Sequence, residues 1–307
     1  MLGNPSDGSD LAPIARGASA DVDAAVAAAQ VDQLAHLEAL DVGKPLKQGR
    51  ADAVALARYL EFYGGAADKV HGDTLPFQAG FTALTLREPH GVTGPIVPWI
   101  YPMQIVGRSV GTALAMGNAC VLKPAEEACL TVLALARIAL ECGLPAGALN
   151  VVTGLGEEAG AALAAHPQMR HISFTGSVAT GALVQAAAAK NAVPVTLELG
   201  GKIPQIVFAD ADLDAARPSV VNAGIQNAGQ TCSAASRVLV EQAVFGAVRE
   251  RMAARYRTFP RPAPRPGHER PRCRPRDLAA PAARGRALPG ARTRQRAAHR
   301  RAGRPAG

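Results

Sequence analysis

The chain has 307 residues, enough for one large domain or two ordinary ones, and 48% of them are apolar, which allows an extensive core. Its formal net charge is +8, but residues 261–307 contain 14 arginines, no lysine and two acidic residues, so the remainder is mildly acidic. The overall charge is therefore no sign of a nucleic-acid-binding protein. The sequence shows no secretory signal, no apolar run of membrane-spanning length and an odd number of cysteines, which together predict a cytoplasmic protein without a membrane partner.

The first part of the chain has helical patterns followed by a hairpin pattern. Alanine-rich sequence predicts a helix over residues 20–40, and a second helix over 48–65 that stops at Gly64-Gly65. Apolar and polar side chains then alternate over residues 73–90, which predicts a pair of antiparallel strands.

From Gly91 onward, short apolar runs alternate with helical segments. The runs predict strands at residues 95–99, 119–123, 149–152, 170–174 and 195–199. This alternation predicts an α/β fold, a Rossmann-like parallel sheet with helices on both faces, in which ligands bind beyond the carboxyl ends of the strands. The residues expected at that edge are Trp99, Lys123, Gly154, Thr175, Gly176, Ser177 and Glu198.

Two further segments follow the sheet. Residues 200–259 have the pattern of two more strands and two helices, so we expect them to begin a second α/β domain after a first domain over residues 1–199. Residues 261–307 contain no Val, Ile, Phe, Tyr or Trp. Such a composition cannot bury a core, and it predicts a disordered Arg/Pro-rich tail.

The sequence Lys123-Pro124-Ala125-Glu126 follows the second predicted strand. At this place in a nucleotide-binding sheet, Lys123 can donate to the adenosine ribose and Glu126 can accept from its 2′-hydroxyl. The carboxylate also disfavours a 2′-phosphate, so NAD is favoured over NADP. Taken alone, however, the motif fits a solvated turn better.

The segment Phe174-Thr175-Gly176-Ser177 joins the fourth strand to a helix. Its small residues would let backbone N–H groups and the helix N-terminus approach a pyrophosphate. The segment does not match the G-x-G-x-x-G fingerprint, and an ordinary serine-capped helix explains it equally well.

Glu198 closes the fifth predicted strand between two leucines. Burial there would raise the pKa of its carboxyl group and suit a general base. The alternative is a strand-end glutamate with its carboxylate in water.

Of the five cysteines, only Cys232 has the setting of a nucleophile, a polar loop of small residues from Gly229 to Ala235. Cys120, Cys129 and Cys142 lie in apolar strand or helix patterns and are expected in the core. Cys273 falls in the tail. No CxxC pair or histidine cluster occurs, so no metal site is expected.

With these residues in hand, residues 5–259 resemble the NAD(P)-dependent aldehyde dehydrogenase superfamily. Five motifs occur in the order of that family: Val97-Pro98-Trp99, Lys123-Pro124-Ala125-Glu126, Phe174-Thr175-Gly176-Ser177, Leu197-Glu198-Leu199-Gly200-Gly201-Lys202 and Gly229-Gln230-Thr231-Cys232. The resemblance implies that Cys232 attacks an aldehyde to give a thiohemiacetal, that hydride transfer to NAD leaves a thioester, and that Glu198 activates the water that hydrolyses it.

The resemblance also implies the partners and the cofactor site. The substrate is a small-molecule aldehyde, and the intact protein is a homo-oligomer with the hairpin at residues 73–90 as its oligomerisation arm. The residues that it implies for binding the dinucleotide are Val97, Pro98, Trp99, Lys123, Ala125, Glu126, Gly156, Phe174, Gly176, Ser177 and Leu199.

The chain departs from the family pattern at several places. Ile100 stands where the family has an asparagine that helps to hold the oxyanion, and loss of one such donor lowers the rate by about 10²–10³-fold. Ile203 replaces a small polar residue, and a helical stretch is missing around residues 29–32. The similarity stops near Phe259, before a Glu-Phe-Gly-Pro segment whose glutamate contacts the nicotinamide ribose.

These departures leave three hypotheses. The first is an aldehyde dehydrogenase whose tail reflects a frameshift near codon 259, with residues 200–259 as a partial catalytic domain. The second is a catalytically inactive fragment that binds nucleotide. The third, which is the weakest, is a nucleic-acid binder acting through residues 261–307, whose arginines lack interleaved aromatic residues.

Overall fold

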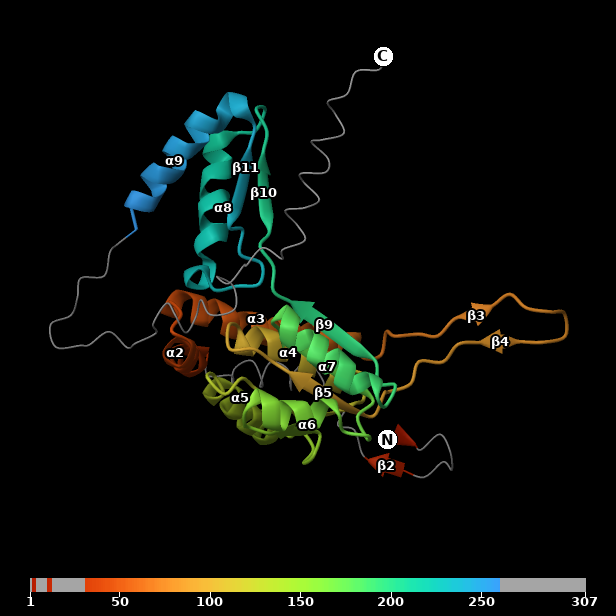
Figure 1. Cartoon of the computed structure of the whole chain (residues 1–307). Helices are drawn as coiled ribbons and strands as arrows, with labels where there is room; N and C mark the ends of the chain where they lie inside the picture. The colour runs from red at the N-terminus through yellow and green to blue at the C-terminus, as the bar shows by residue number, and fades with distance from the viewer. Residues whose placement is uncertain (1, 4–9, 13–30, 260–307) are drawn as a thin grey trace, which may run out of the picture. The chain divides into compact units, whose positions relative to one another are not determined.

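A computed structural model describes residues 2–3, 10–12 and 31–259 of the chain (Figure 1). In the first two of these ranges, strands β1 (Leu2–Gly3) and β2 (Asp10–Ala12) pair antiparallel. The helix expected from residue 20 is present from Val31, and its first part lies outside the described residues, as does the predicted tail.

The centre of the fold is a five-stranded parallel sheet with the strand order β7-β6-β5-β8-β9. The predicted α/β class and all five predicted strands are confirmed, although the first begins at Val92 rather than at residue 95. The strands are β5 (Val92–Ile96), β6 (Ala119–Leu122), β7 (Leu149–Val151), β8 (His171–Gly176) and β9 (Val195–Leu199).

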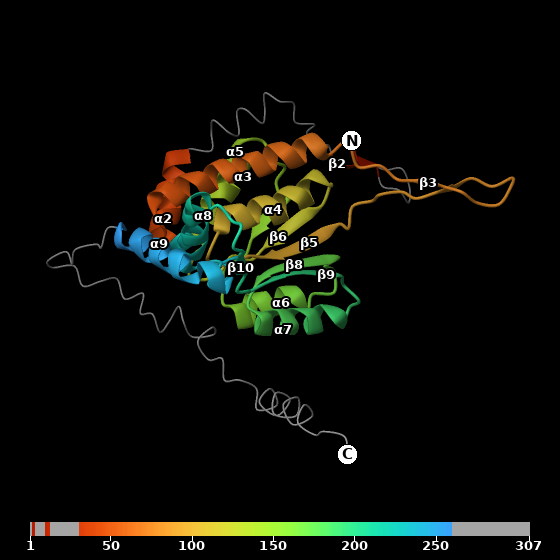
Figure 2. The ribbon, with the colours of Figure 1, turned by 90° about the horizontal axis from the view of Figure 1, so that it is seen from above.

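Helices cover both faces of this sheet, as predicted. One face carries α4 (Pro102–Ala115) and α5 (Leu130–Glu141), which bury Ile105, Val110 and Val132 against β5 and β6. The other face carries α6 (Ala161–Ala164), after the π-helix η1 (Gly156–Gly160), and α7 (Val178–Ala189). Figure 2 shows α6 and α7 on the side of the sheet opposite to α4.

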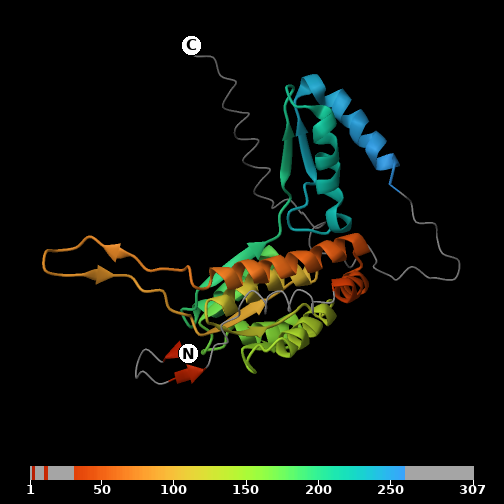
Figure 3. The same cartoon turned by 180° about the vertical axis from the view of Figure 1, so that it is seen from behind.

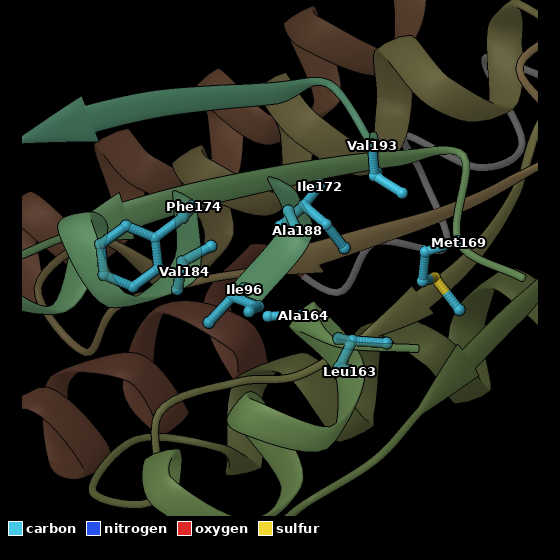
Figure 4. Close-up of a cluster of buried hydrophobic side chains, with 9 residues drawn as sticks. All are labelled: Ile96, Leu163, Ala164, Met169, Ile172, Phe174, Val184, Ala188 and Val193. Carbon is cyan, nitrogen blue, oxygen red and sulfur yellow. The ribbon is translucent and has the colours of Figure 1, made fainter. Parts of the chain in front are cut away.

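The face under α6 and α7 holds the largest group of buried apolar side chains. Figure 4 shows Phe174 and Ile172 of β8 directed toward Val184 and Ala188 of α7, with Leu163 of α6 beside them. Period-two alternation along β8 and β9 supplies these side chains, because every second residue points into this layer.

Two further helices, α2 (Val31–Val42) and α3 (Leu46–Ala66), pack outside α4. Leu34, Leu56 and Met103 are buried where the three helices meet. Gly107 of α4 allows the close approach of α3, because a Cβ there would lie 3.0 Å from the ring of Tyr59. Helices α2, α3 and α4 thus pack together as one layer, which lies next to the turn between β5 and α4.

The predicted hairpin is present, but its paired part is short. Strands β3 (Thr74–Leu75) and β4 (Ala83–Leu84) pair antiparallel. The side chains of Phe77 and Phe81 beyond them are exposed and stack edge to face.

The two strands and two helices expected over residues 200–259 are present. Strands β10 (Pro204–Val207) and β11 (Arg237–Val240) pair in parallel, with α8 (Leu213–Ile225) and α9 (Phe245–Arg257) against them (Figure 3). Val207, Val220 and Val248 form their common core. The short 3₁₀ helices η2 (Gln226–Gly229) and η3 (Gln242–Val244) complete this unit. Across the described ranges, no helix has the length and the hydrophobicity needed to cross a membrane.

Candidate active site

The expected site residues lie at the carboxyl ends of the parallel strands. Strand β5 has β6 on one side and β8 on the other, so the chain reverses direction across the sheet at this strand. Backbone bonds extend the pairing beyond the strands, because Lys123 N–H donates to Pro95 O at 2.9 Å and Val97 N–H donates to Lys123 O at 3.0 Å. Open α/β sheets bind ligands at such a switch point.

Lys123 and Glu126 form an ion pair at this edge. Lys123 Nζ lies 2.7 Å from Glu126 Oε2, and the lysine side chain is 4% exposed against 38% for the glutamate. Burial alone would raise the pKa of Glu126, but hydrogen bonds from Lys123 and from backbone groups including Gly156 lower it below its usual value. The carboxylate is therefore held ionised with one edge open to solvent, and Ala125 lies buried between the two residues.

Gly176 ends β8, where a side chain would not fit. A Cβ on Gly176 would lie 2.5 Å from the ring of Phe174, and a Cβ on Gly181 would lie 2.6 Å from Leu199. Ser177 caps α7, because its Oγ accepts from Thr180 N–H at 3.1 Å. The serine cap considered from the sequence is thus present, and the two glycines leave room for the side chains of Phe174 and Leu199.

For Glu198, the structure shows the second of the two alternatives, a strand-end glutamate in solvent. Its side chain is exposed rather than buried. The reason is the alternation along β9, which directs Val195, Leu197 and Leu199 into the α7 side of the sheet and Thr196 and Glu198 to the opposite side. Within the described residues, no hydrogen bond or ion pair links Glu198 to Cys232.

Cys232 is half-buried in the loop that follows η2. Asn227, at φ 50° in the left-handed region, fixes this loop, because its Nδ2 donates to Ile100 O at 3.0 Å and to Gln230 O at 2.9 Å. A Cβ on Gly201 would lie 3.3 Å from Cys232 O, so the loop after β9 also approaches closely. The Cys232 loop is therefore attached to the turn that follows β5.

Of the other described cysteines, only Cys120 matches the expected core position. It is fully buried, and burial raises the pKa of its thiol. Cys129 is half-buried at the start of α5 and Cys142 is exposed at the end of it, so the expectation of a core position was wrong for Cys142. Cys142 directly follows the last residue of α5 and faces solvent although the helix itself is apolar.

A buried ionic cluster beneath the site was not predicted from the sequence. Lys44 Nζ lies 2.5 Å from Glu38 Oε1 and 2.6 Å from Asp52 Oδ2, and all three side chains are fully buried. Glu38 Oε2 accepts from Met103 N–H at 3.3 Å, and Asp52 Oδ1 accepts from Gln104 Nε2 at 2.6 Å. The cluster thus holds the first turn of α4.

Tyr101 lies between this cluster and the Cys232 loop. Lys44 Nζ sits 4.5 Å from the centre of its ring. Its hydroxyl is buried near the side chains of Gln226 and Thr231 but makes no hydrogen bond of acceptable geometry. Burial, followed by the negative charge of Asp52, raises the pKa of Tyr101 to about 12. No local pattern marks this position beyond an aromatic residue next to Ile100.

Comparison with known proteins agrees with this geometry. The profile of the Aldehyde dehydrogenase family matches residues 30–267. A hydroxyisobutyraldehyde dehydrogenase from Mycolicibacterium austroafricanum is 41% identical over 282 residues, which cover 83% of this chain and 56% of that protein. A mitochondrial aldehyde dehydrogenase of Arabidopsis thaliana, family 2 member B4, is 46% identical over 73% of this chain and 42% of its own length.

Solved structures of aldehyde dehydrogenases are also similar to this chain. An NAD-dependent aldehyde dehydrogenase from Sinorhizobium meliloti superposes with a TM-score of 0.74 at 41% identity, covering 77% of this chain and 47% of that one. A betaine aldehyde dehydrogenase from Staphylococcus aureus in complex with NAD+ superposes with a TM-score of 0.73 at 34% identity, covering 78% and 48%. The chain spans about half the length of the relatives it matches. The chain belongs to the aldehyde dehydrogenase family.

Proposed function

We propose that this chain carries the NAD-binding part (residues 1–199) and the nucleophile (residues 200–259) of an enzyme that oxidises a small aldehyde to a carboxylic acid. The observation that carries the proposal is the attachment of the Cys232 loop to the end of β5 through Asn227 and Ile100 O. This attachment joins the one cysteine in a polar loop to the edge of the sheet where a dinucleotide binds.

The residues at that edge fit a dinucleotide with a free 2′-hydroxyl. Lys123 and the ionised Glu126 can hold the ribose hydroxyls, and Val97, Pro98, Trp99 and Gly156 line the same edge. The N-terminus of α7, which begins after Gly176 and Ser177, could bind the pyrophosphate through its backbone N–H groups. Gly176 has no side chain because the ring of Phe174 occupies that space. The negative charge of Glu126 disfavours a 2′-phosphate, so NAD is favoured over NADP.

The chemistry follows from a thiol and a carboxylate. The Cys232 thiolate adds to the aldehyde carbon, forming a C–S bond and moving the carbonyl electron pair onto oxygen. When bound, the dinucleotide supplies a hydride acceptor, and loss of hydride from the adduct leaves a thioester on Cys232. Glu198 then takes a proton from the water that attacks the thioester, and the acid and the thiolate are released. The exposure of Glu198 keeps its carboxylate within reach of water.

Formation of NADH from a panel of aldehydes tests this function. Cys232→Ser should abolish NADH formation, whereas Glu198→Gln should allow one turnover and then stop, because the thioester persists. Cys142→Ser is the matched control and should leave the rate unchanged. Aldehyde-dependent NADH formation that survives Cys232→Ser would contradict the proposal.

The second candidate function is that of a nucleotide-binding protein without turnover. Ile100 favours it, because its side chain has no hydrogen-bond donor and packs against the apolar core under α4 and α5. NAD binding by titration calorimetry, with no NADH from any aldehyde in the panel, would support this candidate over the first.

We also propose that the β3–β4 hairpin contributes to a homo-oligomer. The exposed edge-to-face pair Phe77 and Phe81 supports this proposal, since large exposed aromatic side chains favour contact with another chain. Light scattering of the chain and of its Phe77→Ser, Phe81→Ser variant tests it, and an unchanged mass would contradict it.

A further inference from the structure

The described part of the chain has three buried side-chain atoms that lack a hydrogen-bond partner, Tyr101 OH, Thr131 Oγ1 and Asn227 Oδ1. Two of them, on Tyr101 and Asn227, flank the turn at Ile100. Buried polar groups in native proteins are nearly always paired, so an unpaired one requires an explanation. An absent ligand with complementary polar atoms is one such explanation.

The Tyr101 ring is held firmly on its inner side. It is 5% exposed, and the Lys44 ammonium sits over the ring at 4.5 Å. Lys44 is in turn fixed by two carboxylates, Glu38 and Asp52. These carboxylates also accept hydrogen bonds from the first turn of α4, which begins directly after Tyr101. The hydroxyl therefore has a defined position rather than a freely rotating one.

The outer side of Tyr101 meets the Cys232 loop. Gln226 and Thr231 neighbour its hydroxyl, and Cys232 is close enough to act on it electrostatically. Asn227 ties the same loop to Ile100 O, one residue before Tyr101. The unpaired donor thus lies beside the segment that carries Cys232.

We propose that the Tyr101 hydroxyl donates the side-chain hydrogen bond that stabilises the oxyanion formed when Cys232 adds to a carbonyl. The inference rests on the proposed function of Cys232, and it names a donor that Ile100 cannot provide. In the addition step, the new C–S bond forms as the carbonyl π pair moves to oxygen, and the phenol donates a hydrogen bond without giving up its proton. A phenol with a pKa of about 12 remains protonated at neutral pH, as this role requires.

Two reagents distinguish stabilisation of the oxyanion by the Tyr101 hydroxyl from a role in which Tyr101 only positions the Cys232 thiol. Acylation of Cys232 by 4-nitrophenyl acetate passes through a tetrahedral oxyanion and releases 4-nitrophenolate, without any cofactor. Alkylation by iodoacetamide displaces iodide and forms no oxyanion. Both are measured on the full chain, the first as a nitrophenolate burst that Cys232→Ser abolishes, and the second as label on the Cys232 peptide by mass spectrometry.

Tyr101→Phe removes only the hydroxyl and should lower the burst rate by about 10²-fold while changing the alkylation rate by less than about twofold. Tyr59→Phe, on the half-buried tyrosine of α3, is the matched control and should change neither rate. Adding Ile100→Asn to Tyr101→Phe should restore the burst at least in part, because an amide then supplies the donor.

Three outcomes would overturn the inference. Equal loss of acylation and alkylation would make Tyr101 a support for the loop alone. No effect of Tyr101→Phe on either rate would leave its hydroxyl without a role. A full chain that shows no Cys232-dependent burst would remove the step on which the inference depends. By contrast, a Tyr101-dependent burst without NADH from aldehydes would contradict the proposed oxidation and leave this inference standing.

Discussion

The Lys44 ammonium lies 2.6 Å from the Asp52 carboxylate with both side chains fully buried, and Glu38 completes the cluster at 2.5 Å. One positive charge is thus shared by two carboxylates and by the ring of Tyr101. A buried charge that loses its partner is strongly destabilising, so this cluster couples the stability of the α2–α4 layer to the turn at Ile100.

Lys44→Met should lower the free energy of unfolding by about 3–5 kcal/mol, because it leaves two carboxylates buried without a cation. Urea denaturation followed by circular dichroism measures the change. The matched control is Arg58→Met, which removes an ion pair to Glu61 whose side chains are 74% and 49% exposed. Arg58→Met should lower the free energy of unfolding by less than about 1 kcal/mol. An equal loss of stability in Lys44→Met and Arg58→Met would contradict a stabilising role of the buried cluster.

Glu38 should make the free energy of unfolding fall as the pH rises, the opposite of the usual effect of a carboxyl group. Its pKa is raised to about 7 from a model-peptide value of 4.5, chiefly by burial and against the opposing effect of Lys44. The folded state therefore binds a proton that the unfolded state releases, so this contribution is fully present below pH 4.5 and is lost as the pH rises through 7. Unfolding free energies measured between pH 5 and about 8 should fall less steeply in Glu38→Gln than in the unmodified chain.

The exposed carboxylate of Glu61 provides the control for this measurement, and Glu61→Gln should retain the pH dependence of the unmodified chain. A Glu38→Gln profile parallel to that of the unmodified chain would mean that Glu38 stays ionised in the fold.

Glu126→Gln should weaken NAD binding by about tenfold or more, because a charge-assisted hydrogen bond to the ribose contributes about 1.5–3 kcal/mol. The same change should raise the affinity for NADP relative to NAD, since in our proposal the carboxylate repels a 2′-phosphate. Titration calorimetry with both dinucleotides measures the two effects. Glu127→Gln, at the exposed neighbouring position, should leave both affinities unchanged.

Asn227→Gly should increase the mobility of the Cys232 loop. Glycine tolerates φ 50°, so the variant removes the two hydrogen bonds to Ile100 O and Gln230 O without adding backbone strain. We expect the iodoacetamide labelling rate of Cys232 to change by severalfold. Asn191→Gly removes a comparable bond, from Nδ2 to Ala165 O at 2.8 Å, away from Cys232, and should leave the labelling rate unaffected.

The sheet could be predicted from the sequence, whereas the buried ionic cluster of Lys44, Glu38 and Asp52 could not. Short apolar runs between helices predicted the five parallel strands because burial on both faces leaves few other patterns. The apolar neighbours of Glu198 left its burial open in the sequence, whereas the period of a strand places those neighbours on the opposite face and Glu198 in solvent. The contact of Lys44 with Glu38 and Asp52 depends on how three helices cross, which no local pattern encodes.

The parallel pair β10–β11 has a consequence for how this chain behaves in a cell. Parallel strands are normally covered on both faces, yet Ile206 of β10 is 60% exposed and Leu239 of β11 is 54% exposed. Apolar side chains on a short, open sheet are recognised by chaperones and promote association during synthesis. Expression at low temperature with chaperone coproduction should therefore raise the soluble yield, and polar substitutions at these two positions should raise it further.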